Sequence, residues 1–114
     1  MFKLKDELVK TTLSNVRGGI GDIIREDFIT AEDKFGKTRL CATFTFPQGS
    51  SIGNHANGPD AIEVYYVLSG SLQVTENGVT KELNSGDAMY TDGKDHSFVN
   101  TSNKDAVLLA VIMG

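Results

Sequence analysis

Apolar residues alternate with polar ones along short segments of this 114-residue chain, and its 12 glycines punctuate those segments. A period of two places successive side chains on opposite faces of a strand, whereas a helix repeats its apolar positions every three or four residues. We therefore expect an all-β domain in which helix is nearly absent. The pattern predicts strands over residues 8–13, 22–30, 38–46, 62–68, 71–76, 79–83, 88–91, 96–100 and 106–113.

Two short segments predict where neighbouring strands turn. Asn77-Gly78 is a pair that takes positive φ at low cost, so it predicts a tight hairpin between the strands that flank it. Ser69-Gly70-Ser71 predicts a second turn, which would make residues 62–83 a three-stranded antiparallel meander. Gly49, Gly70 and Gly86 are expected to form turns rather than to belong to a site.

Composition excludes several classes of protein. Lys and Arg number 11 against 15 Asp and Glu, and the resulting net charge of −4 argues against a nucleic-acid or anionic-membrane surface. No apolar stretch approaches the roughly 20 residues of a membrane span, and the N-terminal residues MFKLKDELVK lack the apolar region of a signal peptide. Cys41 is the only cysteine, so an internal disulfide is excluded. A single cytoplasmic domain is expected.

Both faces of two predicted strands carry mainly apolar or aromatic side chains. In residues 62–68, Glu63 and Tyr65 share one face, while the other face carries only apolar and aromatic side chains. Residues 106–113 are apolar on both sides as well. Only one face of a barrel strand points inward, so the second face must be covered. A homodimer is the simplest cover for that second face. Within the single domain we expect residues 40–114 to form the core, with N-terminal strands in residues 1–39 packing on that core or on the dimer partner.

Both histidines of the chain lie near other candidate metal ligands. If the chain around His55 is extended, His55 and Asn57 project from one face, and Glu63 follows across a short loop. His96 supplies the second imidazole. Imidazole and carboxylate together suit Zn, Mn, Fe, Co, Ni or Cu, and two histidines with one carboxylate leave coordination positions open for a substrate or for oxygen.

The spacing of these residues resembles the two motifs of the cupin superfamily. The first motif is matched by Gly49, His55, Asn57, Glu63 and Gly70, separated by five, one, five and six residues. The second is matched by Gly86-Asp87, His96 and Asn100. The resemblance covers residues 40–113 and implies a double-stranded β-helix (jelly-roll) barrel of the small single-domain kind. It also implies a divalent transition metal (Zn, Mn, Fe, Ni or Co) held by His55, Glu63 and His96.

The chain departs from this family pattern at three places, two in the first motif and one in the second. Asn57 stands where the family has a further histidine, and an amide oxygen is a poorer ligand for such metals. Asn57 is therefore either a weak ligand or a hydrogen-bonding group for substrate or backbone. The loop from Gly58 to Ile62 is longer than in the family, which makes Asp60 a candidate substitute ligand. The turn before His96 is one residue shorter than in the family.

Other polar and aromatic residues are candidates for the surroundings of a site. Tyr65 and Phe98 share faces with Glu63 and His96, which predicts either an aromatic wall beside a metal or plain core packing. Tyr65 is also the weak candidate for a catalytic acid or base. The bend at Arg17-Gly18-Gly19 places an arginine either in an exposed loop or against an anionic substrate group. The alternate residues Arg39, Cys41, Thr43 and Thr45 are candidates for the mouth of a pocket.

Together these features predict a small metal-binding cupin that acts on, or binds, a small polar metabolite such as a sugar or an organic acid. The alternative is a non-catalytic ligand-binding or sensing cupin with weak or no metal. A barrel whose interior serves only packing is a third interpretation. The fold hosts many unrelated activities, so the sequence leaves open whether the protein is an enzyme.

Overall fold

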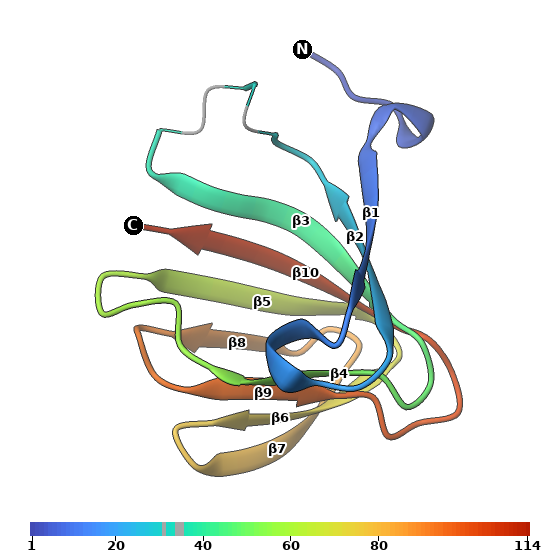
Figure 1. The fold of residues 1–114 in the computed structure, drawn as a ribbon, viewed down its shortest axis with the longest axis vertical. Helices are drawn as coiled ribbons and strands as arrows, with labels where there is room; N and C mark the ends of the chain where they lie inside the picture. The colour runs from blue at the N-terminus through green and yellow to red at the C-terminus, as the bar shows by residue number, and fades with distance from the viewer. Residues whose placement is uncertain (31, 34–35) are drawn as a thin grey trace.

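The computed structural model describes residues 1–30, 32–33 and 36–114, and strands dominate them (Figure 1). Helical structure in these residues is confined to the short 3₁₀ turns η1 (Lys5–Glu7) and η2 (Val16–Gly18). No helix in these ranges is long and apolar enough to cross a membrane. The strands are β1 (Val9–Ser14), β2 (Asp22–Asp27), β3 (Thr38–Phe46), β4 (Ser51–His55), β5 (Ile62–Ser69), β6 (Ser71–Glu76), β7 (Val79–Asn84), β8 (Ala88–Thr91), β9 (His96–Val99) and β10 (Ala106–Met113).

The strands form two antiparallel sheets that enclose one core (Figure 1). The larger sheet has the order β1-β2-β3-β10-β5-β8, and the smaller has the order β4-β9-β6-β7. Side chains from both sheets meet between them, among them Phe46 and Leu108 from the larger sheet and Leu72 and Phe98 from the smaller one. This is the double-stranded β-helix that the resemblance implies, and the all-β class predicted from the alternating pattern is confirmed.

Most strand predictions are confirmed within a few residues. The strands β3, β6, β8 and β10 span the predicted residues, and the tight hairpin is confirmed because Glu76 pairs with Val79 across Asn77 (φ 49°) and Gly78 (φ 81°). The short strand β4 was not among the predicted strands. Its residues, Ser51 to His55, are mostly polar or glycine, so they show no apolar alternation.

The predicted meander over residues 62–83 is wrong. Strand β5 pairs with β10 and β8, whereas β6 belongs to the other sheet. The chain changes sheets at Gly70, where φ is 75° and where a Cβ atom would lie 2.6 Å from the carbonyl oxygen of Asp105. Gly70 thus marks a close backbone approach as well as a turn, and only a residue without a side chain permits both. Gly49 (φ 78°) and Gly86 (φ 93°) are turn formers, as expected.

The apolar side chains of β3 face the core, and its polar side chains face outward, away from any pocket inside the barrel. Ala42, Phe44 and Phe46 are buried, so Cys41 and Thr43 lie on the outer face of the larger sheet. The prediction that the polar set of this strand lines the mouth of a pocket is therefore wrong, because the aromatic residues are driven inward. Strand β2 pairs with β3, so β1 and β2 extend this sheet at its edge. The division of the chain at residue 40 stays a prediction.

The close approach at Gly70 can be tested against another positive-φ glycine. A Cβ atom at Gly86 would have no heavy atom within 4 Å, so Gly86→Ala tests the backbone conformation alone. We expect Gly86→Ala to lower the free energy of unfolding by about 1–2 kcal/mol. Gly70→Ala should cost roughly 1–3 kcal/mol more, because its new methyl group overlaps the backbone of Asp105 and Ala106. Urea denaturation measures both, and equal losses would contradict the close approach.

Candidate functional site

The two histidines and Glu63 meet inside the barrel, because three strands bring them there. His55 ends β4 and His96 begins β9, and the two residues pair directly across these strands. Their ring centroids lie 4.5 Å apart. Glu63 projects inward from β5 in the opposite sheet, and its Oε1 atom lies 3.1 Å from Nε2 of His96. The structure thus gathers the three predicted ligands, which the sequence separates by up to 41 residues.

Backbone carbonyls orient both imidazole rings. Nδ1 of His55 lies 2.8 Å from the carbonyl oxygen of Gly53, and Nδ1 of His96 lies 2.9 Å from that of Lys94. A carbonyl oxygen only accepts, so each Nδ1 carries a hydrogen, and either ring in its neutral form has its lone pair on Nε2. Burial lowers the pKa of His55, only partly opposed by the Gly53 hydrogen bond, and so favours the neutral ring. Metal-binding imidazoles are commonly held in this way.

The carboxylate of Glu63 is fully buried and incompletely paired. Oε1 accepts hydrogen bonds from Tyr65 Oη at 2.5 Å and from Asn57 Nδ2 at 2.8 Å, while Oε2 has no hydrogen-bond partner among the described residues. Nε2 of His96 also faces Oε1, and two lone-pair acceptors at that separation need a proton or a cation to hold them together. The interior of the barrel therefore calls for a proton or a cation beside Glu63.

The donor chemistry of this cluster fits a divalent transition metal. Two imidazole nitrogens and a free carboxylate oxygen are the ligand types that such ions prefer. Among the described residues, however, no group of three or more His, Cys, Asp or Glu side chains is already arranged to hold an ion. Oε1 of Glu63 is held by Tyr65 and Asn57, so Oε2 is the oxygen left for a metal, and binding would require local rotation of these side chains.

Asn57 joins the cluster through both ends of its amide. Its Nδ2 donates to Glu63, and its Oδ1 accepts a hydrogen bond from Nη2 of Arg17 at 3.2 Å. Asn57 thus lies beside Glu63, and its contacts here are hydrogen bonds. Asp60 is exposed in the following turn and does not join the cluster, so it is not the substitute ligand that the longer loop suggested.

Tyr65 and Phe98 form an aromatic wall beside the histidines. Their ring centroids lie 4.8 Å apart in an edge-on arrangement, and Tyr65 Oη lies 3.4 Å from Nε2 of His96. Burial, followed by the hydrogen bond to Glu63, raises the pKa of Tyr65 far above its usual value. The hydroxyl therefore stays protonated near neutral pH, which suits a hydrogen-bond donor and not a general base.

A cavity of about 230 Å³ opens beside this cluster. Its polar lining comes from Arg17, Arg25, His55, Asn57 and Tyr65, and no acidic side chain lines it. Glu63 and His96 are not part of the lining, although both contact residues that are. The rest of the lining is apolar: Leu13, Val16, Leu40, Phe44, Ile52, Phe98, Leu108 and Ile112.

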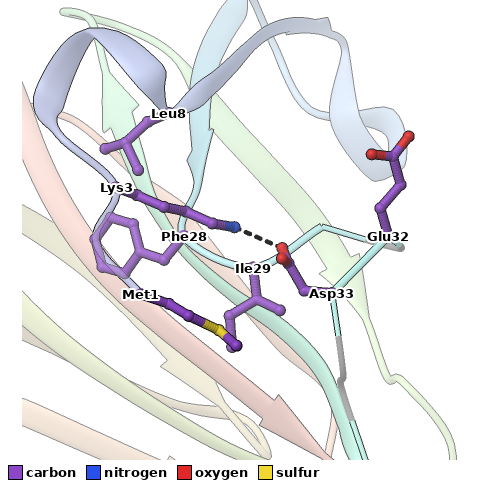
Figure 2. A pocket seen from close by; sticks show the side chains of 7 residues that line it. All are labelled: Met1, Lys3, Leu8, Phe28, Ile29, Glu32 and Asp33. Carbon is purple, nitrogen blue, oxygen red and sulfur yellow. Dashed lines mark hydrogen bonds and ion pairs between the residues drawn. The ribbon is translucent and has the colours of Figure 1, made fainter.

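A larger cavity, of about 760 Å³, lies between residues 1–8, which precede β1, and residues 28–30, 32 and 33, which follow β2 (Figure 2). Lys3 and Asp33 pair with each other there at 2.5 Å, and this contact lowers the pKa of Asp33 to about 2. Glu32 points away from that pair (Figure 2). The remaining described lining residues are apolar: Met1, Leu8, Phe28 and Ile29. No imidazole is among the described residues that line this space, whereas both histidines meet inside the barrel, so the barrel interior is the candidate site.

Gly53 contributes to the site and was not among the predicted site residues. Its carbonyl oxygen orients His55, and a Cβ atom at Gly53 would lie 2.0 Å from the carbonyl oxygen of Arg17. The missing side chain therefore lets the Arg17 loop rest directly on β4. The available signal was the glycine-rich bend at residues 17–21, which indicated an unusual backbone but not its neighbour.

A jelly-roll barrel with inward-facing imidazole and carboxylate groups at the predicted motif positions defines a small single-domain cupin. A family model described as Cupin domain matches residues 42–112. The oxalate-binding protein of Thermotoga maritima is 37% identical over 114 residues, which cover 99% of this chain and 93% of that protein. The chain therefore belongs to the cupin family.

Solved structures agree with this assignment. The crystal structure of a predicted oxalate decarboxylase from Thermotoga maritima superposes with a TM-score of 0.91 at 36% identity, covering 99% of this chain and 98% of that one. KdgF from a Halomonas species superposes with a TM-score of 0.77 at 17% identity, covering 99% and 92%. The second likeness concerns the fold alone.

The need for a proton or a cation beside Glu63 predicts an unusual response to Glu63→Gln. In metal-free protein we expect the free energy of unfolding to stay the same or to rise by up to roughly 3 kcal/mol, because a buried carboxylate without a cation is replaced by a neutral amide. Urea denaturation in the presence of a chelator measures the change.

Glu76→Gln is the matched control for this substitution. Its carboxylate is partly exposed and accepts a hydrogen bond from Thr91, so the free energy of unfolding should change by less than about 0.5 kcal/mol. A loss of stability above about 1 kcal/mol in Glu63→Gln alone would show that Glu63 is already satisfied without a cation.

Proposed function

We propose that the barrel reversibly binds a small organic-acid anion, with oxalate as the leading candidate, at a site completed by a divalent transition metal. The observation that carries this proposal is the cavity lining, which holds two arginines, a histidine and two neutral hydrogen-bonding groups but no carboxylate. Such a lining favours an anion. The relationship to the oxalate-binding protein of Thermotoga maritima supports the same ligand class.

The size of the cavity supports a small ligand. Its volume of about 230 Å³ lies below the roughly 300–1,000 Å³ of pockets that enclose drug-sized molecules. Apolar side chains make up most of its wall, and a wall of low polarity would strengthen hydrogen bonds between Arg17 and a bound anion. A short dicarboxylate fits these limits better than a sugar, which needs many neutral polar partners.

The metal in this proposal is held by His55, Glu63 and His96. When bound, it supplies a Lewis acid for the oxygens of a carboxylate. The chain's own groups act around it: Gly53 and Lys94 keep the imidazole nitrogens directed inward, and Tyr65 holds a proton at its Oη. Zn, Mn, Fe, Ni and Co all suit this donor set, so the identity of the metal is a matter for metal analysis.

Binding without turnover is the form of the proposal that the side chains favour. Tyr65 remains protonated, and no acidic side chain lines the described cavity to act as a second acid or base. The competing function is oxalate decarboxylation, favoured by the solved structure of the predicted oxalate decarboxylase. It would release formate and carbon dioxide, whereas a binding protein returns oxalate unchanged.

Calorimetric titration of metal-loaded protein with oxalate tests the function. We expect saturable binding at one site per chain, and we expect His55→Ala and His96→Ala to lose both the metal and oxalate binding. Asn54→Ala is the matched control, because Asn54 neighbours His55 on β4 but is exposed. If wild-type protein carries metal but does not bind oxalate, oxalate is not the ligand. If formate accumulates in the reaction mixture, the protein is a decarboxylase and not a binding protein.

We also propose that two copies of the chain associate through the outer face of the larger sheet. On β5 the outward side chains are uncharged and 40–45% exposed; they are Ile62, Val64, Tyr66 and Leu68. Val64 and Tyr66 pair with Val111 and Leu109 of β10, so apolar side chains continue across the neighbouring strand. An apolar face of this extent on an exposed sheet is typical of a protein interface.

Sedimentation velocity at micromolar concentration tests the dimer. Wild-type protein should sediment at twice the mass of the chain, and Val64→Lys should sediment as a monomer, because two charges would be buried at the centre of the interface. Val79→Lys is the control, since Val79 is 58% exposed on β7 of the other sheet. Monomeric wild-type protein would exclude this dimer.

A further inference from the structure

The loop between β1 and β2 lies outside the segment that matches the family and has an unusual backbone. Asn15 (φ 50°) and Arg17 (φ 54°) both adopt the left-handed conformation. L-residues other than glycine rarely take it, and it persists only where the surrounding structure enforces it. The strained backbone therefore indicates that neighbouring residues hold this loop in place.

Contacts with β4 enforce the conformation of the loop. The backbone N–H groups of Ile20 and Ser51 donate to Ser51 Oγ and to the carbonyl oxygen of Ile20, each at 2.8 Å. Glycines permit the contact on both sides: a Cβ atom at Gly19 would lie 2.2 Å from the Ser51 carbonyl oxygen, and Gly53 faces Arg17 in the same way. The loop is therefore fixed to the strand that carries His55.

This attachment places the guanidinium of Arg17 at the cavity with its charge uncompensated. Arg17 lines the cavity together with His55, and its side-chain hydrogen bond goes to the neutral Oδ1 of Asn57. Within the described residues it forms no salt bridge, whereas Arg25, the other arginine of the lining, is paired with Asp27 at 3.1 Å. Arg17 is thus the cation that remains free for a ligand.

We propose that Arg17 is the residue that selects the anionic ligand, by binding the carboxylate that points away from His55. This inference rests on the proposed function, and it names a short dicarboxylate as the preferred ligand because the proposed metal would hold one carboxylate and Arg17 the other. A guanidinium presents several N–H donors in a plane and binds a carboxylate in bidentate fashion. Asn57 is a positioning residue, since its amide accepts from Arg17 and donates to Glu63.

The test compares Arg17→Gln, Arg17→Lys and wild type by calorimetric titration with oxalate and with acetate, at equal metal loading. Arg17→Gln should weaken oxalate binding by about 10- to 100-fold, the range expected for lost hydrogen bonds to a charged group. Acetate binding should change far less, so the preference for two carboxylates should collapse. Arg17→Lys should be intermediate, because lysine keeps the charge but not the planar donor geometry.

The control is Lys10→Gln, which makes the same change of net charge on β1, where Lys10 is exposed. Oxalate affinity should not change in it, and metal content should equal wild type in all variants. If wild type and Arg17→Gln bind oxalate with the same affinity, the role of Arg17 is overturned, while the proposed function still stands. If metal-loaded wild type does not bind oxalate, both the role of Arg17 and the proposed function are overturned. If Lys10→Gln loses as much oxalate affinity as Arg17→Gln, the effect of Arg17 comes from net charge alone and the specific role of Arg17 is overturned.

Discussion

A buried carboxylate is the constraint on which the interior of this barrel depends. Glu63 is fully buried inside the barrel, and such a group is tolerated only when it is hydrogen-bonded and its charge is balanced. Tyr65 and Asn57 supply two donors, and both remain committed to Oε1. The unpaired Oε2 and the lone pairs of two oriented imidazoles then make the same demand for a cation. The proposed metal site follows from that shared demand.

The architecture meets the demand by bringing separate backbone segments into direct contact. Gly53 orients His55 with its carbonyl group and, by lacking a side chain, admits the Arg17 loop. Asn57 then links Arg17 to Glu63 through one amide. In the proposed site, ligand recognition and metal retention are therefore assigned to different, adjacent residues. That separation is what makes the role of Arg17 testable without loss of the metal.

Local patterns predicted the strands well, because alternation and turn chemistry are properties of neighbouring residues. The Asn77-Gly78 hairpin is of this kind, since positive φ at both residues fixes the turn. The pairing of β5 was not predictable in the same way. Gly70 predicts a turn in either case, and only the pairing of β5 with β10 and of β6 with β9 shows that the chain crosses to the other sheet. Strand β4 escaped prediction because its place between the loop and β9, and not an apolar pattern, keeps it extended.

The sequence by itself determined the all-β class, the alternation that directs Glu63 and Tyr65 to one face, and the motif spacing that the family shares. These depend on short-range periodicity, which the order of residues records directly. Only the tertiary structure decided which nitrogen of each histidine is free, that Asn57 bridges two charged groups, and that Arg17 stands unpaired at the cavity. Those features arise where distant segments meet, and their distances and partners exist only once the two sheets have closed on each other.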